Sequence, residues 1–230
     1  MLSPLIRHYK HIFQFLAIAL LSLSLFSASC LCASVNQNND FQLWVTEEVS
    51  KKFSSVATVR ISNEWRFGDD VSKLYFFYVQ GVATFRLNDW SDLAPGYRQI
   101  WTLRESEWFL NYEPLINYSL RLKKGVFEWE LRNRISYVFR EQQKDVWLYR
   151  ARLRWVTNWV VRETNLKPYF SNEVFIQEQD AFFQDRIILG LVFPITNMFD
   201  ADFYGMIRFL KNQDRWTHQN IFGTWFNFRF

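Results

Sequence analysis

Residues 126–140 alternate at every step between two kinds of side chain. One set is Phe127, Trp129, Leu131, Asn133, Ile135, Tyr137 and Phe139, and the other is Glu128, Glu130, Arg132, Arg134, Ser136, Val138 and Arg140. Because successive side chains of a β-strand point to opposite faces, a period of two predicts a strand. This strand is longer than the usual length of about five or six residues. One aromatic face and one charged face on a long strand are typical of a membrane-spanning barrel.

The same alternation recurs along the chain. It is strong in residues 53–67, 108–122 and 147–155, and weaker at about 73–87, 96–105, 166–176, 182–193, 199–211 and 216–230. Turn-forming residues such as Gly68, Asp69 and Asp70 separate these segments. The pattern predicts an all-β fold, an antiparallel meander of long strands that closes into a transmembrane β-barrel.

The number of alternating segments predicts the number of strands. Ten segments from Phe53 onward fit a strand, and residues 41–50 are a shorter candidate. Single-chain bacterial barrels have even strand numbers, which puts both chain ends on the periplasmic side. We therefore favour ten strands, with twelve possible if one segment has been overlooked. Either barrel is small, and its own side chains would largely fill the interior.

Residues 1–33 have the order of regions found in a secretory signal peptide. A basic stretch at residues 7–11 precedes an apolar run at residues 15–26, and small, mixed residues follow. We expect cleavage between Ser29 and Ser34, which leaves residues 34–230 as one barrel domain. A lipoprotein anchored through Cys30 is the alternative, but Ser27 stands where such signals carry Leu or a similar residue.

Composition excludes several other classes. Cleavage after Cys32 would remove both cysteines, so a disulfide-stapled secreted domain is excluded. The signal segment holds two of the 27 basic residues, which leaves 25 basic and 23 acidic residues in the rest of the chain. That part is close to neutral, so its net charge does not predict nucleic-acid binding. Residues 34–230 contain no run of about eighteen apolar residues that would form a transmembrane helix. Aromatic residues nevertheless make up 20% of the chain, and Trp residues including Trp44 and Trp225 are candidates for interfacial girdles.

The last strand carries a second sign of an outer-membrane barrel. Phe222, Phe226, Phe228 and Phe230 share one face, and Phe230 is the last residue of the sequence. A terminal strand with alternating aromatics and a final Phe resembles the signal by which the barrel-assembly machinery recognises its substrates. We therefore predict Phe226, Phe228 and Phe230 as an assembly signal, with that machinery and the lipid bilayer as partners in the bacterial outer membrane.

A soluble all-β protein is the alternative fold. A β-sandwich or a lipocalin-like barrel also alternates, but it turns its apolar face inward. Such folds rarely contain strands of about fifteen residues, so the pattern favours the membrane barrel.

Several short segments resemble domain-of-unknown-function family 2490, a family of bacterial outer-membrane β-barrels. The resemblance covers about residues 40–230, and its carriers include Asp40-Phe41-Gln42-Leu43-Trp44, Asn63-Glu64-Trp65-Arg66, Gly96-Tyr97-Arg98, Arg132-Asn133-Arg134 and Arg186 with Gly190. One segment, Asn111-Tyr112-Glu113-Pro114, departs from the pattern because it lacks an Arg. The resemblance implies a barrel in the outer membrane, and it implies no activity.

The charged faces define the candidate site. If the apolar faces meet lipid, the charged residues line the lumen, where each must be paired or hydrated. The predicted lumen network, a possible anion site, comprises Arg60, Glu64, Arg66, Glu113, Glu128, Glu130, Arg132, Arg134, Arg150, Arg152, Arg154, Glu173 and Arg186. We expect this Arg/Glu network to fill a structural barrel or a narrow pore. The excess of Arg supports an alternative, a channel selective for anions or acidic oligosaccharides.

An enzyme at the barrel rim is the remaining alternative. His218 is the only His outside residues 1–33, and Asp214 precedes it in a segment that offers no Ser. By strand parity His218 falls on the lipid-facing side with Phe222, and a lone His at a barrel rim is more often an interfacial side chain than a catalytic base. The sequence contains no metal, nucleotide or phosphate-binding motif. We therefore predict a protein that is not an enzyme and uses no metal or cofactor.

Overall fold

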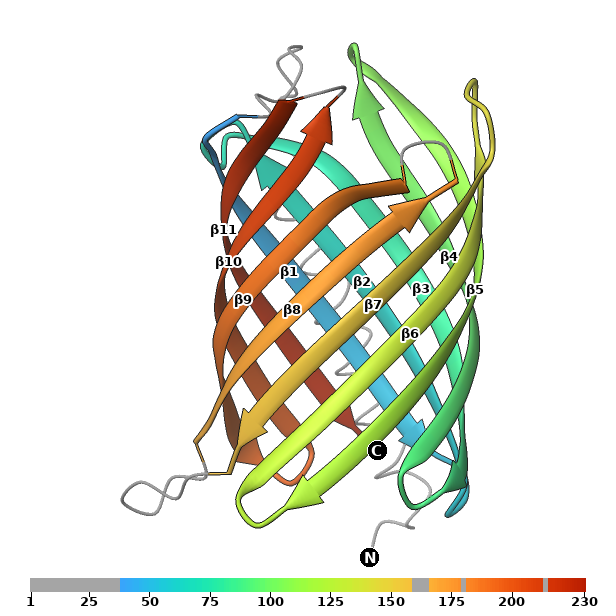
Figure 1. Ribbon diagram of the computed structural model, residues 1–230, viewed down its shortest axis with the longest axis vertical. Coiled ribbons are helices and arrows are strands. Elements are labelled where there is room, and N and C mark those ends of the chain that lie inside the picture. Colours follow the sequence, from blue (N-terminus) through green and yellow to red (C-terminus); the bar gives the residue numbers. More distant parts are fainter. Residues whose placement is uncertain (1–37, 159–165, 179–180, 213–214) are drawn as a thin grey trace, which may run out of the picture. The chain divides into compact units, whose positions relative to one another are not determined.

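The computed structural model describes residues 38–158, 166–178, 181–212 and 215–230. Within these residues eleven strands form one closed barrel (Figure 1). No helix in them is long and apolar enough to cross a membrane. The strands are β1 (Asp40–Lys52), β2 (Ala57–Gly68), β3 (Lys73–Asn88), β4 (Ser91–Arg104), β5 (Glu107–Lys124), β6 (Phe127–Arg140), β7 (Val146–Thr157), β8 (Lys167–Gln177), β9 (Ala181–Thr196), β10 (Phe199–Asn212) and β11 (Arg215–Arg229).

Consecutive strands pair antiparallel, and a parallel seam between β1 and β11 closes the barrel. Along this seam Asp40 lies beside Gln219, and Ser50 lies beside Arg229. We call the end where β1 begins the upper end, and the end where β1 and β11 both finish the lower end, as in Figure 1. The beginning of β1 and the end of β11 therefore lie at opposite ends of the barrel.

The predicted strand number was wrong, because the structure has eleven strands rather than ten or twelve. Residues 41–50 belong to β1, a full strand of 13 residues that pairs with β2 and β11. The even-number rule holds when every pair is antiparallel, and the parallel seam removes that condition. The segment predicted at 53–67 also began too early, because Phe53 lies in a turn and donates its backbone N–H to Ala57 O at 3.0 Å.

The two faces of the sheet have the polarity that the alternation predicts. Inward-facing side chains are polar and buried, as in Gln42, Glu113 and Glu173. Outward-facing side chains are apolar and exposed, and Leu189 for example is 64% exposed. A lipocalin-like protein would show the opposite arrangement, with its apolar face inside.

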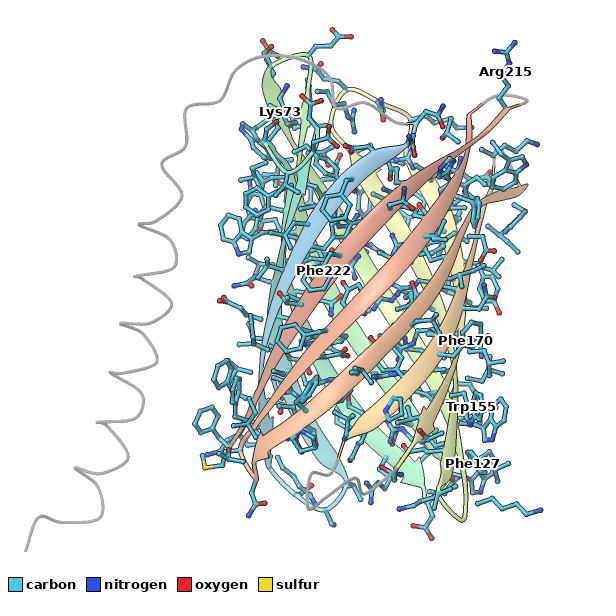
Figure 2. All side chains as sticks on the ribbon, turned by 90° about the vertical axis from the view of Figure 1, so that its left-hand side faces the viewer. Lys73, Phe127, Trp155, Phe170, Arg215 and Phe222 are labelled. Carbon is cyan, nitrogen blue, oxygen red and sulfur yellow. The ribbon has the colours of Figure 1, made fainter. Side chains whose placement is uncertain are left out.

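Aromatic side chains gather on the outer face near both ends. Near the upper end Phe77 stacks between Trp65 and Trp101, at centroid distances of 4.1 and 5.0 Å. Near the lower end Trp129 stacks on Trp155 at 5.6 Å. Figure 2 shows Phe127, Trp155 and Phe170 pointing away from the barrel in its lower half. The two groups form an upper and a lower aromatic girdle, but Trp44 and Trp225 are not among them, because both line the lumen.

Candidate functional site

Trp44 fills the lumen in its upper half. Its side chain is only 1% exposed and packs against Met206 and Ile221. The guanidinium carbon of Arg66 lies 3.7 Å from the centroid of the indole ring. Those of Arg186 and Arg208 lie at 5.0 and 5.8 Å. Contacts of this kind are cation–π interactions, which gain strength when water is excluded.

A chain of hydrogen bonds continues from Trp44 to the upper end. The indole Nε1 donates to Gln42 Oε1 at 2.9 Å, and the Tyr75 hydroxyl donates to the same oxygen at 2.7 Å. Gln42 Nε2 in turn donates to Asp40 Oδ2 at 2.7 Å. Asp40, Gln42 and Trp44 are all buried although Asp40 begins its strand. We call Asp40, Gln42, Trp44 and Tyr75 the upper plug, because these hydrogen-bonded side chains occupy the upper part of the lumen.

Below the upper plug lies a narrow charged chamber. It consists of a cavity of about 150 Å³ and a neighbouring one of about 200 Å³, which share lining residues such as Glu48 and Arg60. Exposure rises toward the lower end, where the Arg121 side chain reaches 39%. Arginines outnumber carboxylates in the first cavity: its charged lining is Glu48, Arg60, Glu64, Arg66, Arg98, Arg132, Arg134, Arg150, Arg152, Arg154, Glu173, Arg186 and Asp202.

Most carboxylates of the chamber are paired. Glu173 accepts from Arg150 on β7 and from Arg186 on β9, the latter at 3.3 Å. The other ion pairs that line the lumen are Arg66–Glu64 at 2.6 Å, Arg98–Glu113 at 3.2 Å, Arg121–Asp92 at 2.6 Å, Arg121–Glu130 at 3.5 Å, Arg154–Asp202 at 3.5 Å and Arg152–Glu130. Breaking a buried pair costs several kcal/mol, so this network fixes the barrel interior.

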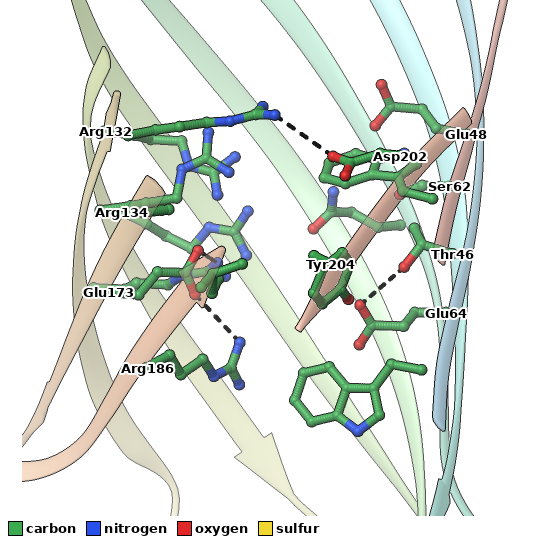
Figure 3. Close-up of a pocket in the computed structure, with 18 of the residues that line it drawn as sticks. Thr46, Glu48, Ser62, Glu64, Arg132, Arg134, Glu173, Arg186, Asp202 and Tyr204 are labelled. Atoms are coloured by element: carbon green, nitrogen blue, oxygen red, sulfur yellow. Dashed lines mark hydrogen bonds and ion pairs between the residues drawn. The ribbon is translucent and has the colours of Figure 1, made fainter. Parts of the chain in front are cut away.

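Charge is distributed unevenly around the lumen. Figure 3 shows Arg132, Arg134 and Arg186 on one wall. It shows Glu48 and Asp202 on the opposite wall, with Thr46, Ser62 and Glu64 beside them. The basic wall is built by β6, β7 and β9 and also holds Glu173 of β8. The opposite wall is built by β1, β2 and β10, although β2 also brings Arg60 and Arg66 to the cavity. An anion that enters the chamber is therefore attracted to one side of it.

Three of the cavity's arginines form no ion pair with a carboxylate of the described residues. Arg134 Nε donates to Asn117 Oδ1 at 2.8 Å, and Arg60 Nη2 donates to Thr84 Oγ1 at 3.1 Å. Arg132 makes no direct ion pair or hydrogen bond within the described residues. In addition, the buried Nε atoms of four further arginines lack an acceptor in the structure: Arg150, Arg152, Arg154 and Arg186.

The structure brings most of the predicted lumen residues together. The first cavity is lined by Arg60, Glu64, Arg66, Arg132, Arg134, Arg150, Arg152, Arg154, Glu173 and Arg186. Glu130 lines the second cavity, and Glu113 reaches the first through its pair with Arg98. Glu128 lines neither cavity and lies opposite Lys123 near the lower end.

Other lumen residues were not singled out from the sequence. Glu48, Asp202, Tyr169 and Tyr204 all line the first cavity, and Tyr169 donates to Asp202 Oδ1 at 3.0 Å. The sequence signal that could have placed them in the lumen was their position in the alternation of β1, β8 and β10. It was weak because apolar and polar residues mix on both faces of these strands.

The remaining predicted residues lie outside the chamber. His218 is exposed and pairs with Phe209 on the outer face, as its parity predicts, and Asp214 lies outside the described residues. Phe226 and Phe228 stack on Phe199 of β10, the latter at 4.7 Å, and Phe230 follows the end of β11. No group of His, Cys, Asp and Glu in the described residues could hold a metal ion.

The fold and the site define a closed β-barrel with an apolar outer surface and an arginine-rich lumen. The family model described as "Protein of unknown function (DUF2490)" matches residues 41–219. The chain belongs to this family, whose match runs from the second residue of β1 into the first third of β11. A search of curated proteins found no match.

Proposed function

We propose that this protein is an integral β-barrel of a bacterial outer membrane, exported by the signal peptide predicted at residues 1–33. The observation that carries this proposal is the inverted polarity of the barrel, which is apolar outside and charged inside. Two aromatic girdles on the outer face support it, because such girdles lie at the interfaces of a bilayer. The strands have 11 to 18 residues, and about 9–11 are enough to span the hydrocarbon core.

The role that we propose for the lumen is non-enzymatic. The ion pairs of the chamber stabilise a structural barrel, and its arginine excess lets small anions enter from the lower end. The upper plug closes the other end, so the resting barrel is not a diffusion pore. The support for this closure is the buried cluster of Trp44, Met206 and Ile221 in the upper half of the lumen.

A narrow anion-selective pore is the second candidate function. The arginine excess favours it, because rings of Arg select anions. This function requires the upper plug to move away from the lumen axis. It therefore predicts that weakening the plug increases conductance, with a reversal potential that follows the anion gradient.

Membrane fractionation tests the barrel proposal. We expect the protein in the outer-membrane fraction, and we expect the unboiled protein to migrate differently from the boiled protein in SDS gels. Amino-terminal sequencing of that protein should show cleavage between Ser29 and Ser34. A protein that appears in the periplasmic fraction with no heat-dependent shift would overturn the proposal.

Planar-bilayer recording separates the two lumen functions. We expect little current from the refolded wild type, and Trp44→Ala together with Tyr75→Phe opens the plug. If the pore function is right, this double variant conducts anions, and adding Arg150→Ala, Arg152→Ala and Arg154→Ala lowers its selectivity. Absence of current from every variant that still shows the heat-dependent shift rules out the pore and leaves the structural barrel.

A further inference from the structure

Two arginines of β6 lie directly opposite two arginines of β7 on the inner face. Arg132 is the cross-strand partner of Arg152, and Arg134 is the partner of Arg150. Directly opposed side chains on one face of a sheet have Cβ atoms about 4.5–5.5 Å apart, and like charges in such pairs are destabilising. We call these four residues the arginine quartet. Two adjacent like-charge pairs inside a narrow barrel need negative charge nearby.

The carboxylates of the protein satisfy only part of this need. Arg152 pairs with Glu130, which Arg121 also contacts, and Arg150 pairs with Glu173, which Arg186 also contacts. Each of these carboxylates is thus shared between two guanidinium groups. Among the described residues, Arg132 and Arg134 form no ion pair with a carboxylate, and the Nε atoms of Arg150 and Arg152 have no acceptor. The quartet therefore keeps both excess positive charge and unused donors.

The quartet is buried and faces the chamber. All four residues line the first cavity, and Arg134 and Arg152 are more than nine-tenths buried. A cavity of about 150 Å³ holds only a few water-sized groups, so its ligand must be small. Guanidinium groups bind planar or tetrahedral oxyanions through paired N–H donors. The unpartnered donors, the charge and the size together define the chemistry of the ligand.

We propose that the arginine quartet binds one small, free oxyanion of the phosphate or sulfate type, which neutralises the two Arg–Arg pairs. This inference rests on the proposed function, because it places the site in the lumen of the membrane barrel. The phosphate of a lipid is not the ligand, because the quartet faces the lumen and the outer face of β6 and β7 carries Trp129 and Leu153.

Glu48 offers a second way to test the proposal. It is buried, lines both cavities and makes no direct ion pair within the described residues. Figure 3 shows it on the wall opposite Arg132 and Arg134. A carboxylate in this place repels an anion bound to the quartet. Removing its charge should tighten the binding of the anion, whereas removing charge from the quartet should weaken it.

Binding is measured on the full-length mature barrel, refolded in uncharged detergent micelles that contain no phospholipid. Equilibrium dialysis with labelled inorganic phosphate, at constant ionic strength in chloride, should show saturable binding that unlabelled sulfate displaces. Arg132→Gln and Arg134→Gln should each weaken binding about tenfold or more, since each removes charge-assisted hydrogen bonds. Glu48→Gln should strengthen it. Arg215→Gln, which removes the same charge at an exposed position at the start of β11, should leave binding unchanged.

A stability measurement separates a ligand site from a purely structural network. Without phosphate, Arg132→Gln should raise the urea midpoint of unfolding, because it relieves the repulsion with Arg152. With saturating phosphate the wild type should become the more stable protein. A wild type that shows the heat-dependent shift but binds no phosphate, or a loss of binding that Arg215→Gln reproduces, overturns the inference and leaves the proposed membrane barrel intact. Absence of the protein from the outer-membrane fraction would instead count against the proposed function.

Discussion

The phenol ring of Tyr204 on β10 lies directly over Gly223 on β11. A Cβ atom added at position 223 would lie only 1.9 Å from Cζ of that ring. The two residues are cross-strand partners on the inner face, so the ring covers the place where a side chain would be. Tyr169 covers Gly190 in the same way on β8 and β9, at 2.5 Å. Aromatic rings that cover glycines pin the register of neighbouring strands.

Gly223→Ala should therefore destabilise the barrel by about 1–3 kcal/mol, the usual cost of overpacking a filled interior. The Tyr204 ring must move, and it packs beside Trp44 and Met206 in the upper half of the lumen. Urea unfolding of the refolded barrel, followed by tryptophan fluorescence, measures the change. Gly205→Ala is the matched control, because an added Cβ there meets nothing within 4 Å. Equal effects of the two substitutions would contradict this account.

Glu173→Gln should be among the most destabilising single substitutions in the lumen. The carboxylate is buried and serves both Arg150 and Arg186, so its loss leaves two buried guanidinium groups without a charged partner. Removing one member of a buried pair typically costs about 3–5 kcal/mol. Asp200→Asn is the control, since the side chain of its partner Arg229 is 46% exposed and pairs with an exposed member contribute about 0–1 kcal/mol. The same urea titration should separate the two variants clearly.

Quenching by brominated lipids tests which tryptophans face the bilayer. Trp129 is 40% exposed on the outer face, whereas Trp44 is 1% exposed inside the lumen. In vesicles of bromine-labelled phospholipid, Trp129→Phe should lower the quenched fraction of the fluorescence. Trp44→Phe should raise that fraction, because it removes a tryptophan that lipid does not reach. A reversed result would mean that the two faces of the sheet are exchanged relative to the membrane.

Phe230→Ala should impair assembly in cells more than folding in detergent. The side chain is exposed on the outer face, while the backbone N–H of Phe230 donates to Ser50 O at 2.9 Å across the seam and is kept in the variant. We expect less protein in the outer-membrane fraction and an unchanged heat-dependent shift after refolding in vitro. Phe222→Ala, on the same face of β11 but away from its end, is the control. Equal losses in both variants would point to general destabilisation.

The sequence predicted the two faces of most strands because a period of two is a local property. In β6 and β7 the alternation is strict, and each residue could be assigned to the lumen or the outer surface. In β1 it is blurred, because Glu47 lies on the outer face and hydrogen-bonds Asn63 there, next to inward-facing Thr46 and Glu48. For this reason residues 41–50 looked like a doubtful strand, and the strand number came out wrong.

The arrangement of the site was less accessible from the sequence than its composition. The arginines of the quartet could be named, but the pairs Arg132–Arg152 and Arg134–Arg150 depend on strand register. Register depends on the turn between β6 and β7, whose length does not fix it. The upper plug depends on contacts across the lumen, such as that of Trp44 with Arg186, between strands far apart in the chain. No local pattern encodes such contacts.

The parallel seam gives the barrel a direction. In the membrane placement proposed above, the strand that begins the barrel enters it from one compartment and the strand that completes it ends in the other. The backbone thus changes sides an odd number of times, so Asn38 and Asn39, just before β1, and the aromatic end at Phe230 meet different surroundings. Labels attached at Asn38 and at Phe230 would report on the two sides of one membrane from a single polypeptide.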